Sequence, residues 1–357
     1  MTVLLYRPSL DLLSGAGQLV LMQWRALRAA NVPAEIGCER GALKFWLRSA
    51  TVPRRLTAAA ASRLQREGTR FVVDHGLCVP DAGLVFVHNL ATEASLHVER
   101  ADWAPQVAAE RAFFRALSPT ARVVANSDLV KTALCKHFGL EPERVVVHCP
   151  GFRSDRFTPE RTGELRAAAR RDLGLDDRTL LVGFVTSGDF AKRGLDLFLA
   201  TAAEIARDRP DVRFLVVGSK RLPADARDHA LVGRGIVQHR PKRSRPERWF
   251  AALDLFLYAA RFEEFGMVVL EAQAAGVPIV TSRLVGAAQC LARTSQDWLV
   301  ERPDPTELAS RSLALLANAG LRGDLARAGV AHAASVDDRE YARATLETIL
   351  AQKRRLK

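Results

Sequence analysis

Short apolar runs alternate with longer stretches of mixed polarity along most of this chain. In the first part, runs with the length and β-branched content of buried strands occupy residues 1–8, 70–73, 84–87, 123–126 and 145–148. Stretches with the spacing of amphipathic helices lie between them, at residues 19–30, 105–117 and 129–138. Alternating strands and helices predict a parallel sheet covered by helices.

The pattern breaks at residues 150–177, which are polar, charged and interrupted by turn-forming residues. We interpret this segment as an interdomain connection followed by a helix. A second alternation follows, with apolar runs at residues 180–185, 213–217, 236–239, 253–258 and 278–281. The sequence therefore predicts an α/β protein with Rossmann-like domains over residues 1–160 and 161–336 and a terminal helix over residues 337–357.

Composition is consistent with two globular domains. The chain has 357 residues, of which 48% are hydrophobic and 26% charged, enough to build two cores. Arg7 and Asp11 interrupt the apolar start, so we expect no secretory leader. No apolar run approaches the ~18 residues of a membrane span. Five scattered cysteines without a Cys-x2-Cys pair indicate reduced thiols, so a cytoplasmic protein is expected.

Net charge is +12, and part of the excess is concentrated. The stretch between Arg40 and Arg70 holds eight basic residues and one acid, Glu67, and includes the aromatic residues Phe45 and Trp46. Such a stretch suits an anionic membrane surface or a phosphorylated lipid. Nucleic acid would suit it electrostatically, but no nucleic-acid-binding signature accompanies it, so none is expected as a partner. A solvated basic face is the alternative.

The segment RFEEFGMVVLEAQAAGVPIV is the most informative one for function. It is expected to form a loop, a helix starting near Gly266 and a strand, with Glu263 in the loop and Glu271 inside the helix. The unpaired N–H groups of a helix start attract phosphate. A carboxylate on each side of a bound phosphate can accept hydrogen bonds from hydroxyls. A nucleotide sugar has this layout of sugar, diphosphate and ribose.

This segment resembles the Glu-x7-Glu motif of the retaining glycosyltransferases of family 4. The resemblance implies the GT-B fold, in which two Rossmann-like domains face across a cleft and the C-terminal helix returns to the N-domain. It also implies that Glu263 holds the donor sugar and Glu271 the nucleotide ribose. Phe265, Gly266 and Met267 would supply backbone amides. Two surface carboxylates on an ordinary helix are the alternative interpretation.

The segment GFVTSGDFAKRGLDLFL supplies candidate cations. Lys192 and Arg193 lie beside a predicted helix start, where they can bind a diphosphate. The family usually has an Arg early in this loop and a Lys directly before the glycine. Here Arg193 takes the Lys position and Gly188 the Arg position. Lipopolysaccharide core glucosyltransferases have a similar loop with the two cations in the opposite order. A solvated basic pair is the alternative.

Three further residues of the second half resemble donor-site positions of the family. Gly218 ends the strand RFLVVG and matches a glycine that lines the nucleotide pocket. Arg240 lies where relatives hold the base, although a plain surface Arg is equally compatible. Gly286 fits a turn that faces the diphosphate; many relatives have a second Gly and a Glu there, where this chain has Ala287 and Gln289.

In the first half, His88 ends the run LVFVHN, and ligands of open α/β sheets bind beyond the carboxyl ends of strands. We expect it near the reacting sugar, as the family resemblance implies, with Asn89 as the fallback. A satisfied structural histidine is the alternative. Gly15 and Gly17 are expected to let the first loop close over the diphosphate or the acceptor.

Taken together, these features predict a retaining glycosyltransferase that moves a hexose, expected to be UDP-linked, to a lipid-linked or lipopolysaccharide-core saccharide. His88, Lys192, Arg193 and Glu263 are the expected catalytic residues. No Asp-x-Asp motif is present, so neither a metal nor a cofactor is expected. Peripheral attachment to the inner face of the cytoplasmic membrane is expected. A non-catalytic nucleotide-sugar-binding partner and a GT-B nucleotide-sugar epimerase remain open.

Overall fold

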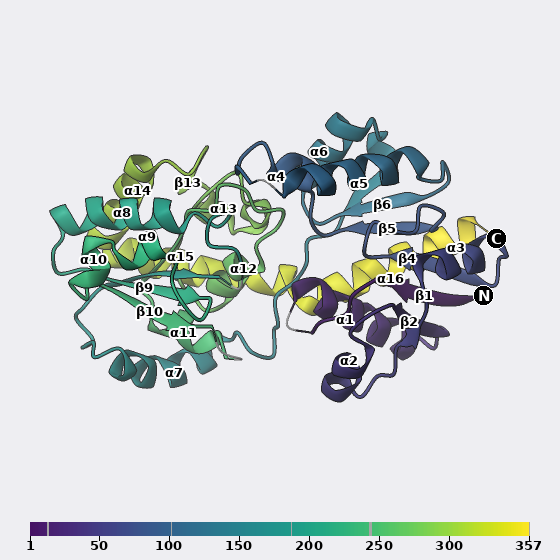
Figure 1. Cartoon of the computed structure of the whole chain (residues 1–357). Helices are drawn as coiled ribbons and strands as arrows, with labels where there is room; N and C mark the ends of the chain where they lie inside the picture. The colour runs from purple at the N-terminus through teal and green to yellow at the C-terminus, as the bar shows by residue number, and fades with distance from the viewer. Residues whose placement is uncertain (13, 101, 187, 243–244, 357) are drawn as a thin grey trace. The chain divides into compact units, whose positions relative to one another are not determined.

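A computed structural model describes residues 1–12, 14–100, 102–186, 188–242 and 245–356. The chain divides into two compact units, Met1–Pro150 with Asp338–Lys357, and Gly151–Asp337 (Figure 1). The division falls ten residues before the expected boundary at residue 160. The reason is that Phe157 lies edge-on to Phe250, at a centroid distance of 5.9 Å, and so belongs to the second core.

Within the described residues, the first unit contains a seven-stranded sheet in the order β3-β2-β1-β4-β5-β6-β7, and all its pairs are parallel. The strands are β1 Thr2–Tyr6, β2 Ala34–Cys38, β3 Arg54–Arg55, β4 Arg70–Asp74, β5 Leu84–Val87, β6 Arg122–Ala125 and β7 Val145–Val147. The five predicted strands are confirmed. Strands β2 and β3 were not predicted, because β2 is short and broken by Glu35 and Gly37, and β3 is two exposed arginines.

Helices cover both faces of this sheet. They are α1 Gly15–Ala29, α2 Ala42–Ser49, α3 Ala58–Arg66, α4 Ala91–Ala94, α5 Trp103–Ala116 and α6 Asp128–Phe138, followed by the 3-10 turn η1 Pro142–Arg144. Helix α1 begins four residues before its predicted start at Leu19, because the Ser14 side chain accepts a hydrogen bond from Gly17 N–H and caps the helix. Gly15 and Gly17 therefore lie in the first helical turn rather than in a loop, which corrects the expectation.

The C-terminal helix α16, Asp338–Arg355, packs against α1 of the first unit, as predicted (Figure 1). Gln23 donates to the Tyr341 hydroxyl at 3.1 Å, and Ile349 is fully buried in the core. The Gln352 side chain donates to the carbonyls of Gly83 and Thr120, at 3.1 and 2.8 Å. Lys357, the last residue of the predicted helix, lies outside the described residues.

The second unit repeats the architecture with a parallel six-stranded sheet in the order β10-β9-β8-β11-β12-β13, counted over its described residues. The strands are β8 Leu181–Val185, β9 Arg213–Gly218, β10 Val237–Pro241, β11 Leu255–Tyr258, β12 Ile279–Ser282 and β13 Leu299–Val300. The five predicted strands of this half are confirmed, and β13 is an additional two-residue edge strand.

The helices of the second unit lie before, between and after these strands. They are α7 Pro159–Asp172, α8 Leu195–Asp208, α9 Ala224–Arg227, α10 Ala230–Gly233, α11 Glu247–Ala252, α12 Met267–Ala274, α13 Arg293–Gln296, α14 Pro305–Ala317 and α15 Ala319–Ala333, with the 3-10 turns η2 Gly286–Cys290 and η3 Ala334–Val336. Among the helices in the described parts of the chain, we find none that combines the length and the apolar character needed to cross a bilayer.

Each sheet contains one point at which the strand order reverses. In the first unit this point lies between β1 and β4, and in the second it lies between β8 and β11. Loops leaving the two strands at such a point diverge, and the crevice between them is where open α/β sheets bind ligands. The topology therefore directs attention to the loops that follow β1 and β4, and β8 and β11.

Candidate active site

The two motifs singled out in the second half of the sequence occupy the two loops at the β8/β11 reversal. Strand β8 ends at Val185, and the loop that follows carries Lys192 and Arg193 into α8. Strand β11 ends at Tyr258, and its loop carries Glu263 into α12. The sheet thus joins segments about seventy residues apart in sequence, as the predicted parallel topology requires.

Arg193 and Glu263 form an ion pair between the two loops. The pair is largely enclosed, since the Glu263 residue is 6% exposed. The Tyr258 hydroxyl donates to Glu263 Oε2 at 3.0 Å and fixes the carboxylate from the strand side. Burial raises the pKa of Tyr258, so its hydroxyl keeps its proton and remains a donor. Sequence analysis missed Tyr258, although a hydroxyl at the end of an apolar strand was a usable signal.

Lys192 makes a second ion pair beside the first. Its Nζ lies 2.7 and 2.6 Å from the two carboxylate oxygens of Glu264, and both residues are buried. Burial lowers the pKa of Lys192, while Glu264 opposes that shift. The ammonium is therefore neutralised by a protein carboxylate, and its expected contact with a diphosphate stays a prediction. Sequence analysis missed Glu264; the match of two adjacent acids to two adjacent cations was the available signal.

Gly266 holds the turn between Glu263 and α12. Its φ of +91° is rarely adopted by residues with a side chain. A Cβ at this position would lie 2.9 Å from Glu263 Cγ and 3.2 Å from Val285 Cγ1. The turn is also tied to the neighbouring segment, because Gly286 N–H donates to the Glu263 carbonyl at 2.9 Å and Ala287 N–H donates to the Phe265 carbonyl at 2.7 Å. Glycine is thus required for the Glu263 carboxylate to stay where it is.

Helix α12 begins at Met267, and no side chain caps its N-terminus. Its first N–H groups accordingly have no partner within the helix, as expected for an anion-binding helix start. Glu271 follows in the second turn of α12 and is partly buried. Burial raises the pKa of Glu271 to about 7; Lys242 and Arg156 oppose the shift, and Glu247 adds to it. Near pH 7, this carboxyl group therefore exists in both protonation states.

The raised pKa of Glu271 predicts a pH dependence of donor binding. The ionised carboxylate accepts hydrogen bonds from two hydroxyls, whereas the protonated form also presents a donor. Because the motif predicts that Glu271 holds the ribose of a nucleotide diphosphate sugar, the affinity for such a ligand is expected to weaken as the pH falls through about 7. Calorimetric titration of the wild type and of Glu271→Gln measures this. The variant should show a flat profile; a flat wild-type profile would contradict the assignment.

Two predicted donor residues lie on β9 and β10, the strands on the side of β8 away from β11. Gly218 ends β9, and its carbonyl accepts a hydrogen bond from Lys242 N–H. Arg240 lies on β10, the edge strand, and donates to the Gln238 side chain at 2.9 Å and to the His239 carbonyl at 3.0 Å. Arg240 therefore bonds to residues of its own strand, and the structure does not bring it to the Arg193–Glu263 pair.

In the first unit, His88 directly follows β5, and His75 directly follows β4. His75 Nδ1 and His88 Nε2 are 3.0 Å apart, and the rings stack at a centroid distance of 5.3 Å. Arg7 donates to the His75 carbonyl at 2.7 Å, and Asn126 to that of His88 at 3.1 Å. Burial lowers the pKa of His88 to about 3, and Arg7 adds to the effect. Both rings are neutral at pH 7, so one donates to the other.

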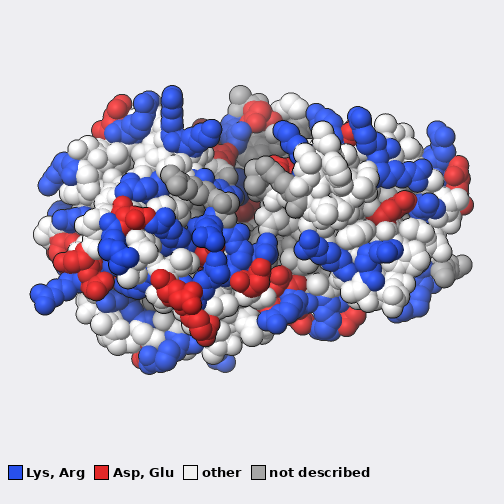
Figure 2. Space-filling view, turned by 90° about the horizontal axis from the view of Figure 1, so that it is seen from below, with Lys and Arg blue, Asp and Glu red and all other residues white. Residues whose placement is uncertain are grey.

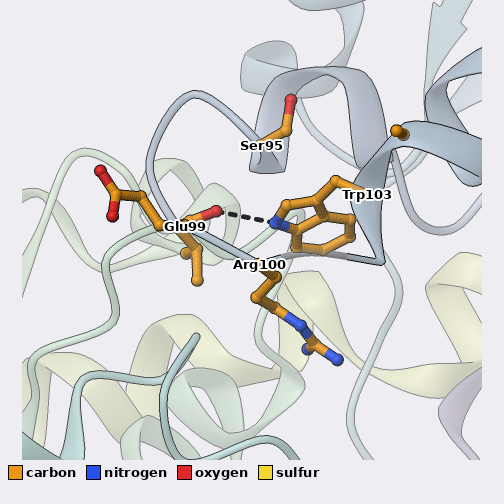
Figure 3. Close-up of a pocket in the computed structure, with 6 residues that line it drawn as sticks. Ser95, Glu99, Arg100 and Trp103 are labelled. Atoms are coloured by element: carbon orange, nitrogen blue, oxygen red, sulfur yellow. Dashed lines mark hydrogen bonds between the residues drawn. The ribbon is translucent and has the colours of Figure 1, made fainter.

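His75 was not identified from the sequence, although it occupies the same position after its strand as His88. Because His88 Nε2 is engaged by His75, its other nitrogen, Nδ1, is the one left for a ligand. Elsewhere in the first unit, the loop between α4 and α5 borders an open hollow lined by Ser95, Val98, Glu99, Arg100, Trp103 and Ala104 (Figure 3). The Trp103 indole donates to the Val98 carbonyl at 2.7 Å, and the predicted site residues lie elsewhere.

Comparison with solved structures identifies the fold. The structure resembles that of WaaG, a glycosyltransferase involved in lipopolysaccharide biosynthesis, with a TM-score of 0.76 and 19% identity over 97% of this chain and 99% of that one. It also resembles Anabaena HepE in complex with UDP-glucose, with a TM-score of 0.74 and 18% identity over 98% of this chain and 100% of that one. The predicted GT-B fold, with two Rossmann-like domains, is confirmed.

The sequence of the second unit resembles a known family. Residues 162–318 match the family described as glycosyl transferases group 1. A D-inositol 3-phosphate glycosyltransferase of Segniliparus rotundus is 31% identical over 59% of this chain and 48% of its own length. A D-inositol 3-phosphate glycosyltransferase of Rhodococcus jostii is 32% identical over 69% of this chain and 56% of its own length. The chain spans only about half the length of these relatives.

Proposed function

We propose that this protein is a retaining glycosyltransferase that moves a hexose from a UDP-sugar to a lipid-linked or lipopolysaccharide-core saccharide. One observation carries the proposal: Arg193 and Glu263 meet at the β8/β11 reversal, directly before the uncapped start of α12. A guanidinium and a helix start offer the donors that a diphosphate needs, and the carboxylate offers acceptors for the adjoining sugar. The group 1 domain and the UDP-bound structural neighbour support the same assignment.

In the proposed mechanism, Arg193 and the N-terminus of α12 stabilise the negative charge that develops on the leaving diphosphate. Arg193 has five N–H donors, so its contact with Glu263 leaves others for a phosphate. Glu263 holds the hydroxyls of the sugar, and Glu271 those of the ribose. The acceptor hydroxyl attacks from the face that the phosphate leaves, and the departing phosphate takes its proton. The chain supplies positioning and electrostatic stabilisation rather than a nucleophile.

We further propose that this reaction requires no divalent metal, because Arg193 and α12 supply the positive charge that a metal would otherwise provide. Turnover of UDP-glucose is expected to be unchanged by an excess of a chelator, and added Mg²⁺ or Mn²⁺ should not raise it. Measuring UDP release with and without the chelator tests this. Loss of activity that returns only when one of these ions is restored would overturn it.

The acceptor has a second candidate. The relatives that share about 31–32% identity carry the name D-inositol 3-phosphate glycosyltransferase, which makes a soluble phosphorylated polyol an alternative to a lipid-linked saccharide. Both candidates combine hydroxyls with nearby phosphate. They differ in whether the acceptor is free in solution, so the same assay can compare them directly.

The test is release of UDP from UDP-glucose in three arms: with a lipopolysaccharide-core acceptor, with D-inositol 3-phosphate, and without an acceptor. The proposal expects release only with an acceptor and an α-configured product. Release with D-inositol 3-phosphate but not with the lipopolysaccharide-core acceptor would mean that the acceptor is the soluble polyol and not a lipid-linked saccharide. An isomerised nucleotide sugar in the arm without an acceptor would indicate an epimerase. Binding without turnover in any arm would indicate a non-catalytic partner.

A further inference from the structure

An apolar surface lies on helix α2 and the segment that follows it. Few large hydrophobic side chains are strongly exposed among the described residues, and four of them fall within residues 43–52. We call these four side chains the α2 apolar face: Leu43, Trp46, Leu47 and Val52, exposed by 66%, 44%, 68% and 77%. Single exposed apolar residues are ordinary, but four within ten residues of sequence indicate an interaction surface.

The fold itself turns this face outward. Phe45 is 1% exposed and anchors α2 in the core of the first unit. Residues 43, 46 and 47 have the spacing of one helical face, and the opposite face carries that anchor. After the helix, Thr51 and Pro53 are buried, so Val52 between them is directed to solvent. The exposure is therefore a consequence of local structure and does not come from a frayed segment.

Basic residues flank the α2 apolar face along the chain. Arg40, Lys44, Arg54 and Arg55 all have exposed side chains. Arg54 shares Glu35 with Arg70, at 3.6 and 2.6 Å, and retains an exposed side-chain fraction of 48%. Helix α2 lies at the lower edge of Figure 1, and Figure 2 views the molecule from that side. In the part formed by the first unit, Lys and Arg atoms border uncharged surface.

We propose that the α2 apolar face inserts into the interface of an anionic lipid bilayer. Tryptophan and leucine side chains lie favourably at the boundary between headgroups and acyl chains, and the surrounding cations lie at the level of anionic headgroups. A nucleic acid would engage the cations but would leave the apolar side chains in water. The combination of both chemistries on one helix therefore favours a membrane surface.

Membrane binding by α2 also bears on the choice of acceptor, and this extension rests on the proposed function. An enzyme held on an anionic leaflet by α2 would take a lipid-linked acceptor from the same leaflet, which favours that acceptor over a soluble polyol. The docking face itself contains none of the proposed donor-site residues. Membrane binding and donor binding can therefore be measured and lost independently.

The experiment is flotation of the full chain with vesicles of phosphatidylglycerol and phosphatidylcholine, compared with vesicles of phosphatidylcholine alone. The wild type should float with the anionic vesicles at low salt. A triple variant, Leu43→Ser with Trp46→Ser and Leu47→Ser, should bind more than ~10-fold more weakly, because the lost apolar area no longer enters the interface. The matched control is Leu96→Ser, which removes another exposed leucine, 62% exposed, and should bind as the wild type does.

A second pair of variants separates the two chemistries. Lys44→Gln and Arg55→Gln should each weaken binding about 5-fold at low salt and less at high salt. Melting temperature and UDP-glucose binding of every variant report whether the fold and the donor site are intact. Equal flotation of the wild type and the triple variant would overturn the proposal, whatever happens to donor binding. So would a wild-type dimer that the triple variant abolishes, since the face would then be covered by a second copy.

Discussion

Replacing Arg193 by Gln is expected to lower kcat by about 10²–10³, the usual cost of removing one preorganised donor to developing negative charge. Arg193 is the cation of the β8 loop that the fold places against Glu263 of the β11 loop. The effect should fall mainly on kcat, because charge on the diphosphate grows as the sugar leaves. Steady-state kinetics with UDP-glucose and the acceptor found above measure it. Arg193→Lys should retain much of the activity, since the positive charge remains.

Arg261→Gln provides the matched control for this prediction. Arg261 belongs to the β11 loop and, like Arg193, pairs with an acid of the other loop's segment, Asp196, but that pair is solvent-accessible and lies at the start of α8. Its loss should change kcat by less than about 3-fold, the effect of a surface pair. Equal losses in Arg193→Gln and Arg261→Gln would mean that the loops respond to any charge removal, and the proposed role of Arg193 would be withdrawn.

Replacing Glu264 by Gln is expected to destabilise the protein by about 3–5 kcal/mol, because it leaves the Lys192 ammonium buried without its carboxylate. Chemical denaturation of the wild type and the variant measures the change. The double variant Lys192→Met with Glu264→Leu removes both charges and should recover most of the lost stability. Asp324→Asn, which breaks an exposed pair with Arg327, should leave stability nearly unchanged.

The outcome for the Lys192–Glu264 pair also assigns the role of Lys192. If Glu264→Gln proves neutral for stability, the ammonium must find another counter-charge or lie in water, contrary to the buried pair seen here. If stability falls as expected while donor affinity is unchanged in the double variant, Lys192 is a structural residue. The predicted contact between Lys192 and the diphosphate would then be wrong.

The sequence was sufficient to predict the architecture because most strands coincide with short runs of apolar residues. Ten of the strands overlap the short apolar runs from which they were predicted. Strand β3, by contrast, is held by pairing with β2 and consists of Arg54 and Arg55, so no local pattern could reveal it. The start of α1 was missed because glycines conceal a helix that the Ser14 cap begins. Edge strands and capped ends depend on neighbours that local sequence does not contain.

The candidate site shows the same limit at the level of side chains. The proximity of Arg193 and Glu263 followed from a parallel sheet, because loops after neighbouring strands meet at one edge. The sequence did not show which of the two adjacent acids pairs with which of the two adjacent cations. That choice depends on the positive φ of Gly266 and on the Tyr258 hydroxyl. The pairing of His75 with His88 likewise required the register of β4 and β5.

The central claim is that the second unit binds a nucleotide diphosphate sugar between Arg193, Glu263 and Glu271. Thermal unfolding with a panel of UDP-, GDP- and ADP-sugars, for the wild type and Glu271→Ala, tests it most directly. The account predicts that UDP-sugars stabilise the wild type by about 2.7 kcal/mol at ~100-fold excess over Kd, and that Glu271→Ala loses most of this at the same concentration. Absence of stabilisation by every nucleotide, or equal stabilisation of both proteins, would contradict it.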